Sequence, residues 1–366
     1  MSQPLDQPQV EQVQALLAAI RARLTRPWTL MEVCGGQTHA ILRHGLDQLL
    51  PPELELIHGP GCPVCVTDAA VIDQAQALAA FPGVLLCTYG DMLRVPGSAG
   101  RDLLAVRSSG GRVRIVYAPL DVLAIARDHP ELTVVFLAVG FETTAPATAL
   151  LAHRAWIEGL TNLKLLVSLV RVPPALEAIL AEPEARVQGF LAAGHVASVM
   201  GLDEYAPIAQ RHKVPIVVTG FGALELLEGV LRCVSQLEQG EHRVENAYRQ
   251  GAPNGGNAAA QALIERVFAP CDRLWRGLGV LNQSGLRLRA PYDALAADDL
   301  LQGGSSAEST RSAPAEPVCL SGRVLQGLAR PTDCPSFGTL CSPDRPLGAP
   351  MVSSEGACAA YHRYRP

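Results

Sequence analysis

Short apolar runs alternate with helical stretches along the first two thirds of the chain. Each run leads into a Gly-rich or polar turn and then into a segment whose apolar residues recur at helical spacing. This alternation is typical of βαβ units, in which parallel strands form a sheet with helices on both faces. The runs that predict strands are Thr29–Val33, Leu54–Ile57, Val84–Thr88, Val113–Tyr117, Thr133–Val139, Lys164–Val170 and Val214–Thr219.

The number of these runs indicates how the chain is divided. Seven units over roughly 200 residues favour two doubly wound α/β lobes with parallel sheets over one sheet, and we place the boundary near Glu131. Before the first strand, apolar positions from Val10 to Leu24 predict an amphipathic helix that ends before Pro27 and covers a lobe from outside. In such folds ligands bind beyond the carboxyl ends of the strands, so the turns after the runs are where chemistry is expected.

The C-terminal part of the chain has a different composition. The stretch from Asp293 to Pro317 is rich in Gly, Ser, Ala and Pro, which is typical of a linker or surface loop. Residues 318–366 contain four cysteines and too few periodic apolar residues to build a core unaided, which indicates a domain held together by metal. The expected parts are therefore a first lobe at 1–130, a second lobe at 131–290, and a linker with a cysteine-rich domain at 291–366.

Composition excludes several classes of protein. Hydrophobic residues make up 48% of the 366 residues and charged residues 18%, as in ordinary globular proteins. The net charge of -5 offers no electrostatic footprint for nucleic acid. The only lysines are Lys164 and Lys213, and neither follows a glycine, so a Walker A phosphate loop is absent. No apolar run is long enough for a membrane span, and the N-terminus lacks the layout of a signal peptide, so we expect a cytoplasmic protein.

Ten cysteines are the unusual feature of the composition. In a reducing compartment they indicate metal binding, catalysis or core packing rather than structural disulfides. Three of them, Cys87, Cys233 and Cys271, lie in a predicted strand, on an apolar helix face and near a helix end, and we interpret them as packing residues.

The first motif with chemical potential is CGGQTH, at residues 34–39, directly after a predicted strand and before a helical segment. A thiol at a helix N-terminus is favoured as thiolate, and the paired glycines let a bulky ligand approach the backbone. His39 or Thr38 could supply a proton or a hydrogen bond to a group held on Cys34. The alternative is a small buried residue followed by a Gly turn and a Thr N-cap, and the motif alone leaves both open.

The second motif, GPGCPVC at residues 59–65, again follows a predicted strand and precedes a helix. Two cysteines three residues apart, Cys62 and Cys65, can close a disulfide or share a metal, and the helix start lowers the pKa of the nearer thiol. His58 is placed to tune that thiol. We favour redox chemistry or transient metal binding, with a zinc site or packing as the alternatives.

The third motif is GFETTAP at residues 140–146, which places a carboxylate and two hydroxyls at another strand end. Glu142 could accept a proton or orient a ligand. Helix capping by Thr143 or Thr144 is the simpler explanation of this motif when it is taken alone.

The last set contains all four cysteines of the C-terminal domain. Four thiolates in one poorly cored segment are a complete ligand set for a [4Fe-4S] cluster or a Cys₄ zinc site. Zinc ribbons usually present two close pairs of cysteines, and this spacing does not, so we favour iron-sulfur. The residues are Cys319, Cys334, Cys341 and Cys358.

Five segments of the chain together resemble the HypD family of [NiFe]-hydrogenase maturation proteins. The resemblance extends from about Leu30 to Tyr364. The segments are MEVCGGQTHA, IHGPGCPVCVT, AVGFETTAPA, WRGLG and DCPSFGTLCSPDRPLGAPMVSSEGACAAYHRY. The resemblance implies a cytoplasmic assembly scaffold with redox activity, built of two α/β lobes and a [4Fe-4S] domain. Such a scaffold works with a HypC chaperone and holds an iron ion while it gains two cyanides and a carbon monoxide. The HypE protein, with HypF upstream, provides the cyanide, and the finished Fe(CN)2(CO) unit passes to the hydrogenase large subunit.

The resemblance also implies roles for individual residues. Cys34 would hold the iron jointly with a HypC thiol, and Cys62 and Cys65 would be a redox pair that either ligates iron or only exchanges electrons. The family pattern further implies that His39 and Glu142 line the cleft. The implied ligands of the cluster are Cys319, Cys334, Cys341 and Cys358.

Two positions depart from the family pattern. Pro350 stands where many relatives carry another cysteine, and Gly222 stands where an acidic residue is expected. Two other functions remain open besides the scaffold: an iron-sulfur thiol-disulfide oxidoreductase that acts on protein disulfides, and a zinc-stabilised binding module. The first leaves CGGQTH without a role, and the second predicts a colourless protein.

Overall fold

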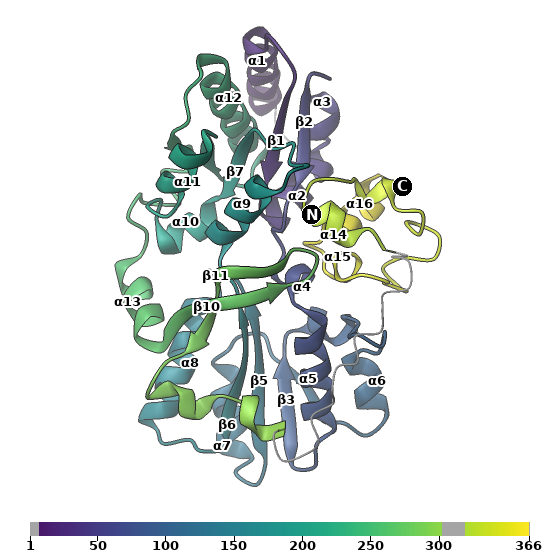
Figure 1. The fold of residues 1–366 in the computed structure, drawn as a ribbon, viewed down its shortest axis with the longest axis vertical. Coiled ribbons are helices and arrows are strands. Elements are labelled where there is room, and N and C mark those ends of the chain that lie inside the picture. The colour runs from purple at the N-terminus through teal and green to yellow at the C-terminus, as the bar shows by residue number, and fades with distance from the viewer. Residues whose placement is uncertain (1–6, 302–318, 366) are drawn as a thin grey trace.

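The computed structural model describes residues 7–301 and 319–365. Figure 1 shows two α/β lobes, one above the other, with the C-terminal domain packed beside their junction. This arrangement confirms the expected fold class of two lobes with parallel sheets and a cysteine-rich C-terminal part. Among the described residues, no helix has both the length and the apolar character that a membrane crossing requires.

The upper lobe is built on a five-stranded parallel sheet with the order β2-β1-β7-β8-β9. Its strands are β1 (Trp28–Glu32), β2 (Leu54–His58), β7 (Gly189–Ala193), β8 (Ile216–Thr219) and β9 (Val244–Asn246). The helices of this lobe are α1 (Gln7–Arg23), α2 (Gly35–His44), α3 (Leu46–Leu49), α9 (Val172–Ala181), α10 (Gly194–Met200), α11 (Tyr205–His212) and α12 (Ala223–Gln239).

The lower lobe contains a four-stranded parallel sheet with the order β4-β3-β5-β6. Its strands are β3 (Val84–Thr88), β4 (Val113–Ile115), β5 (Thr133–Gly140) and β6 (Leu163–Leu169). Its helices and 3₁₀ turns are α5 (Ala69–Ala80), η1 (Gly90–Arg94), α6 (Leu103–Ser108), α7 (Asp121–Asp128), α8 (Ala145–Ile157), η2 (Tyr292–Leu295) and η3 (Asp298–Leu301). The helix α13 (Ala258–Val267) packs on α8.

The remaining elements lie between the lobes or beside them. An antiparallel hairpin, β10 (Phe268–Trp275) and β11 (Gly279–Leu288), crosses the junction, and the short helix α4 (Pro63–Val66) connects the lobes. The C-terminal domain consists of α14 (Ser321–Leu325), η4 (Pro331–Asp333), α15 (Ala349–Val352) and α16 (Ala357–Tyr364).

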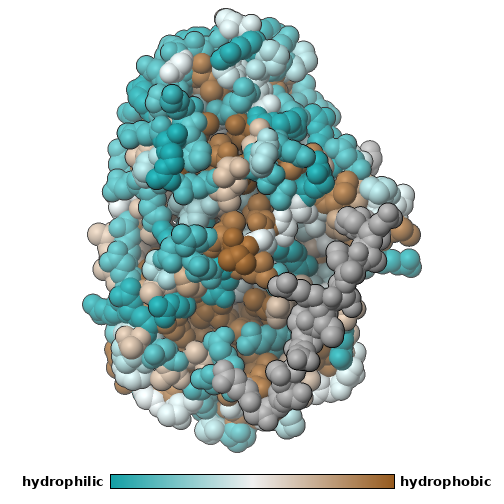
Figure 2. Space-filling view, viewed as in Figure 1, coloured by the Kyte–Doolittle hydropathy of each residue, from teal (hydrophilic) through white to brown (hydrophobic). Residues whose placement is uncertain are grey.

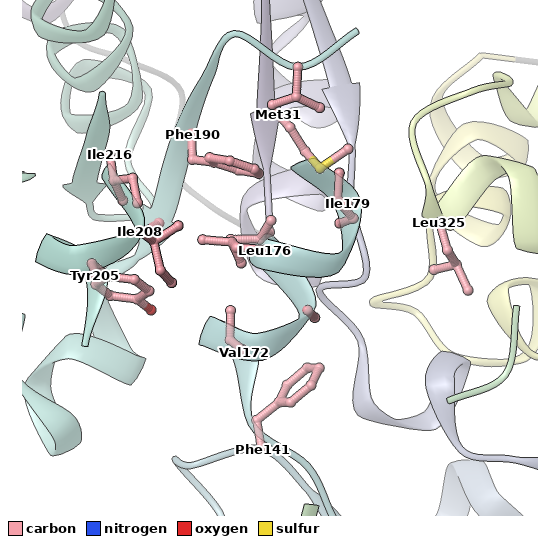
Figure 3. Packing of buried hydrophobic residues seen from close by; sticks show 14 of the residues in the cluster. Met31, Phe141, Val172, Leu176, Ile179, Phe190, Tyr205, Ile208, Ile216 and Leu325 are labelled. Atoms are coloured by element: carbon pink, nitrogen blue, oxygen red, sulfur yellow. The ribbon is translucent and has the colours of Figure 1, made fainter. Parts of the chain in front are cut away.

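Both faces of the upper sheet are covered because its side chains alternate. Leu30 and Leu191 face α1, α2 and α12, whereas their neighbours Met31 and Phe190 face α9 and α11. The apolar cluster that contains Met31 and Phe190 extends to Phe141 of the lower lobe and to Leu325 of the C-terminal domain (Figure 3). One apolar cluster therefore joins all three parts. On the face shown in Figure 2, apolar side chains gather near the middle, where the lobes meet.

The boundary expected near Glu131 is wrong, because the lobes are not consecutive in the chain. β1 pairs with β7, so the chain leaves the upper lobe after β2, builds the whole lower sheet, and then returns. Glu131 lies between α7 and β5, inside the lower lobe. The expected ranges 1–130 and 131–290 consequently do not coincide with the two sheets. Parallel pairing between strands this distant leaves no local mark on the sequence.

The other predicted helices and strands match those of the structure closely, and the strands that were not predicted are β7, β9, β10 and β11. The N-terminal helix and all seven predicted strands are present. The prediction omitted β7, whose sequence GFLAA has no β-branched residue, and also β9 and the hairpin strands. Of the stretch from Asp293 to Pro317, the first part packs on the lower lobe through Leu295 and Ala297. Residues 302–317 lie outside the described part of the chain.

Candidate functional site between the lobes

A pocket of about 710 Å³ lies where the carboxyl ends of the two sheets face each other. Loops that follow β1, β7 and β8 supply Cys34, His195 and Phe221 from the upper lobe. Loops that follow β3 and β5 supply Asp91 and Thr143 from the lower lobe. The C-terminal domain closes one side with residues 353–355. The expectation that ligands bind beyond the carboxyl ends of the strands therefore holds for both lobes at one site.

Cys34 is the N-cap residue of α2 and is only 4% exposed. Burial raises the pKa of its thiol to about 12, and the nearby Glu32 carboxylate adds to this shift. The backbone N–H groups of Gly36 and Gln37 oppose the shift without overcoming it. The expectation that the helix start favours thiolate is therefore outweighed by desolvation. The sulfur becomes a thiolate when a bound cation takes the place of its proton.

The side chain of His195 contacts that sulfur. Both of its ring nitrogens lie 3.9 Å from Cys34 Sγ, and its ring stacks on Phe221 with the centroids 5.1 Å apart. Burial lowers the pKa of the imidazole, which favours the neutral ring. His195 is not among the residues predicted from the sequence, because β7, the strand that precedes it, was not predicted. The available signal was the His that follows the run GFLAAG at a strand end.

A buried polar network lies behind Cys34. Glu32, which is fully buried, accepts hydrogen bonds from the Cys34 backbone N–H at 2.8 Å and from the Thr38 hydroxyl. His58 Nδ1 lies 2.6 Å from the same carboxylate, and its ring meets Tyr361 of α16 edge-on. The Thr38 hydroxyl therefore donates its hydrogen bond to Glu32 and not to a group held on Cys34. The network ties the loops that carry Cys34 and Cys62 to the C-terminal helix.

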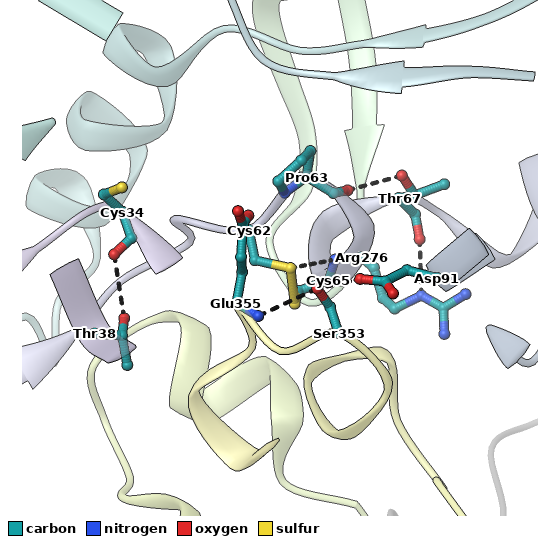
Figure 4. The surroundings of a disulfide bond; sticks show 10 residues. All are labelled: Cys34, Thr38, Cys62, Pro63, Cys65, Thr67, Asp91, Arg276, Ser353 and Glu355. Carbon is teal, nitrogen blue, oxygen red and sulfur yellow. Dashed lines mark hydrogen bonds between the residues drawn. A yellow bond between two sulfur atoms is a disulfide. The ribbon is translucent and has the colours of Figure 1, made fainter. Parts of the chain in front are cut away.

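Cys62 and Cys65 form a disulfide, and both are buried (Figure 4). Cys62 is the N-cap residue of α4, and its sulfur accepts a hydrogen bond from the Cys65 backbone N–H at 3.2 Å. A Cβ atom on Gly61 would lie 2.3 Å from the Cys34 backbone nitrogen. The two cysteine loops are therefore in direct backbone contact, and of the two arrangements left open for this pair the structure contains the disulfide.

Glu142 is buried beside the pocket, and its side chain turns toward α9. One carboxylate oxygen accepts a hydrogen bond from the Val172 backbone N–H at 2.8 Å, and the other has no hydrogen-bond partner among the described residues. Burial raises the pKa of the carboxyl to about 7. Its neighbours Phe141 and Thr143 line the pocket. The structure therefore places Glu142 next to the pocket, where it caps a helix of the other lobe.

His39 lies away from the pocket of Cys34. Its Nε2 is 2.9 Å from the hydroxyl of Tyr364, and it borders a separate hollow beside the C-terminal domain. Five residues on from Cys34, it is turned roughly 140° around the helix from that position. The structure thus brings Cys34 and the disulfide together and leaves His39 at the contact between α2 and α16.

The four cysteines of the C-terminal domain line one small pocket with mainly apolar neighbours. Burial raises the pKa of Cys358, and the other three thiols add to that shift, as expected for sulfurs that face a common centre. The Leu347 backbone N–H donates to Cys341 Sγ at 3.3 Å, and a Cβ on Gly348 would come within 2.8 Å of Cys319 Sγ.

This donor set fits a [4Fe-4S] cluster, because each iron takes one thiolate and N–H groups point at the sulfurs. Across residues 7–301 and 319–365, no group of three or more His, Cys, Asp or Glu side chains forms a ready site for a metal ion. Helix α15 packs on α4, so it lies between the cysteine pocket and the disulfide.

Comparison with known proteins places the chain in a family. The model of the family described as "HypD: Hydrogenase formation hypA family" matches residues 11–365. The chain belongs to the HypD family. The hydrogenase maturation factor HypD of Azotobacter vinelandii is 46% identical over 359 residues, which cover 96% of this chain and 93% of that protein. The factor of the same name from Escherichia coli is 43% identical over 367 residues, which cover 97% and 96%.

The two departures from the expected HypD pattern have clear positions in the fold. Pro350 lines the pocket of the four cysteines, so the extra cysteine expected there would lie beside the same pocket. Gly222 is the N-cap residue of α12, where the Glu225 carboxylate accepts from the backbone N–H groups of Phe221 and Gly222, each at 2.9 Å.

The three cysteines interpreted as packing residues divide into two kinds. Cys87 and Cys233 are fully buried in apolar clusters, which confirms that interpretation for both. Cys271 is half-buried on β10, a strand of the hairpin.

Proposed function

We propose that this chain is a hydrogenase maturation factor that holds an iron ion on Cys34 while the Fe(CN)2(CO) unit is assembled. Membership of the HypD family and the names of its relatives, which are hydrogenase maturation factors, support the role in maturation. The single observation that carries the site is the position of Cys34, a buried thiol at the meeting point of both sheets, with His195 at 3.9 Å. The iron and its diatomic ligands are cargo.

Thiolate is a soft ligand, which suits low-spin iron with cyanide and carbonyl. Because burial disfavours the free thiolate, Cys34 would keep its proton until iron arrives. A neutral His195 beside the sulfur is able to take that proton as the Fe–S bond forms. These two residues therefore have complementary roles: one binds the metal and the other removes the proton that competes with it.

The size of the pocket supports the participation of partner proteins. A volume of about 710 Å³ exceeds what one iron ion and three diatomic ligands need, so a segment of another chain fits as well. We propose a HypC-type chaperone as the source of a second thiol and a HypE-type protein, with HypF upstream, as the cyanide donor. The hydrogenase large subunit would receive the finished unit, and the setting would be the cytoplasm.

The disulfide and the cysteine pocket support a redox part of the function. We propose that Cys62 and Cys65 alternate between disulfide and dithiol beside the iron site. The residues that would hold a [4Fe-4S] cluster are Cys319, Cys334, Cys341 and Cys358. Such a cluster supplies or accepts single electrons. Helix α15 lines the cysteine pocket and packs on α4, so it connects the two sulfur sites through direct contacts.

Infrared spectroscopy of the chain purified with its small partner tests this proposal. The variant Cys34→Ala should keep the fold and abolish the iron-cyanide and iron-carbonyl bands, because the soft ligand is lost. Cys271→Ala is the matched control, since it removes a half-buried thiol from the hairpin and should leave the bands unchanged. Bands of undiminished intensity in Cys34→Ala would contradict the assignment.

One observation favours a second candidate, a thiol-disulfide oxidoreductase acting on protein disulfides: the Cys62–Cys65 bond itself. Both sulfurs are buried, however, which restricts access by a folded substrate. Turnover of a disulfide-bonded protein substrate distinguishes the two candidates. The oxidoreductase requires turnover that survives Cys34→Ala, whereas the scaffold predicts none. Metal analysis of anaerobically purified protein separates both from a zinc-stabilised module, because zinc without iron would support only the latter.

A further inference from the structure

The turn between β10 and β11 contacts the segments that carry the two sulfur sites. On one side, the Arg276 backbone N–H donates to the Val66 carbonyl at the end of α4, at 2.9 Å. On the other side, the Gln326 side chain of the C-terminal domain donates to the Gly277 carbonyl at 2.8 Å. The WRGLG run therefore contacts both the disulfide-bearing helix and the cysteine-rich domain.

The side chain of Arg276 carries a partly buried positive charge into this junction. Its Nε donates to the Thr67 carbonyl at 2.8 Å and its Nη2 to the Pro96 carbonyl at 3.0 Å. Both partners are neutral, and no carboxylate in the described part of the chain forms an ion pair with it. Because a partly buried charge is screened less than an exposed one, the guanidinium acts over a longer range than a surface arginine would.

The charged groups around Arg276 come from both sides of the junction. Burial lowers the pKa of its guanidinium, while Asp68, Asp73 and Cys319 oppose that shift. Cys319 belongs to the pocket of four cysteines. Figure 4 draws Arg276 together with the Cys62–Cys65 disulfide and Thr67. The residues that Arg276 hydrogen-bonds, Val66 and Thr67, directly follow Cys65 in the chain. One partly buried cation thus lies on the segment that follows the disulfide and within electrostatic reach of Cys319.

We propose that Arg276 is a positioning residue that sets the reduction potential of the Cys62–Cys65 pair. Reduction breaks the S–S bond with two electrons, and each electron that is not matched by a proton leaves negative charge on sulfur. A nearby cation stabilises that reduced state and so raises the potential. This inference rests on the proposed redox role of the pair and names the residue that tunes it.

Equilibration of the full-length chain in glutathione buffers tests the proposal without any cluster. Two glutathione thiols reduce the disulfide and become oxidised glutathione, so the electrons balance. Alkylation and mass spectrometry of the peptide spanning residues 44–94 report the fraction of the pair that is reduced. For Arg276→Met we expect the equilibrium constant for reduction of the Cys62–Cys65 disulfide by glutathione to be about tenfold lower than in wild type. This corresponds to a reduction potential about 30 mV lower. Arg276→Lys keeps the charge and should stay within about threefold of wild type.

Two further variants sharpen the test. Arg289→Met removes a guanidinium from the opposite end of the same hairpin, where it bonds the Phe268 carbonyl, and should leave the equilibrium constant unchanged. Asp68→Asn removes a negative charge near Arg276 and keeps the N-cap of α5, so it should raise the constant. The opposite signs at Arg276 and Asp68 distinguish a charge effect from a loss of packing.

The proposal is overturned if Arg276→Met leaves the constant at its wild-type value. It is equally overturned if Arg276→Lys lowers the constant as far as Arg276→Met does, because the arginine would then act only through its hydrogen bonds. If Arg276→Met does not fold, Asp68→Asn decides, and an unchanged or lower constant rejects the charge effect. A pair that glutathione cannot reduce in the wild type would instead reject the proposed redox role itself.

Discussion

At the scale of single residues, burial decides the chemistry of the site. Cys34 has a helix start beside it, yet desolvation holds the pKa of its thiol at about 12. Glu142 shows the same effect on a carboxyl, whose pKa burial raises to about 7. Neither effect is visible in a motif, because a motif shows neighbours along the chain and not the solvent that folding removes.

The raised pKa of Glu142 predicts a pH-dependent stability. Its ordinary value is 4.5, so between about pH 4.5 and 7 the native state binds more protons here than the unfolded chain does. The free energy of unfolding therefore falls as pH rises through this window, and the loss persists above pH 7. Glu142→Gln cannot ionise and keeps an oxygen for Val172. Urea unfolding should show its stability relative to wild type rising by roughly 3 kcal/mol between pH 4.5 and 8.

A matched variant makes this measurement specific. Glu177→Gln removes a carboxylate that is 39% exposed, pairs with Arg211 and is not among the charges that act on Glu142. Because Glu142 is left in place, this variant should keep the pH dependence of the wild type over the same range. A Glu142→Gln difference that stays constant from pH 4.5 to 8 would show that Glu142 is not the titrating group.

At the scale of elements, the loops that follow parallel strands build the pocket. The sequence patterns identified β1, β2, β3 and β5 and so located the loops that bear Cys34, Cys62 and Glu142. They missed β7, whose glycine and alanines give no β signal although all its residues are buried. His195 was missed with it. Strand propensity reflects packing on both faces, and a strand of small residues between two helical layers depends on its neighbours rather than on its own sequence.

The contact between the two cysteine loops predicts a sensitive glycine. Gly61→Ala would place a Cβ atom 2.3 Å from the Cys34 backbone nitrogen, so the loops must separate. We expect a loss of roughly 1 to 3 kcal/mol in the free energy of unfolding, the range typical of overpacking. The nearest atom to a Cβ on Gly90, at the rim of the same pocket, would lie 4.0 Å away. Gly90→Ala should therefore stay within about 0.5 kcal/mol of wild type, and equal losses in the two variants would contradict the steric explanation.

At the scale of the whole molecule, the chain passes from the upper lobe to the lower lobe and back before the hairpin and the C-terminal domain fill the junction. β1 depends on β7 for one of its two neighbours, although the two strands lie more than a hundred residues apart. The pocket exists only when both lobes are complete, because each contributes loops to it.

This topology predicts that residues 1–130 do not fold alone. The fragment has β1 and β2 without β7, and β3 and β4 without β5, so each sheet would lose its centre. We expect the fragment to show no cooperative transition when its unfolding in urea is followed by circular dichroism. The full chain should show at least one such transition. A cooperative transition in the isolated fragment would contradict the interleaved arrangement.

The sequence by itself determined the α/β class, most strands, and the residue types that carry the chemistry, because these depend on local periodicity and on short motifs. It also indicated the family, which the comparisons confirmed. Only the tertiary structure decided that the lobes interleave, that His195 and not His39 stands beside Cys34, and that the turn bearing Arg276 contacts both α4 and the C-terminal domain. The reason is physical: strand pairing, burial and charge proximity join residues that are distant in the chain, and local patterns carry no record of them.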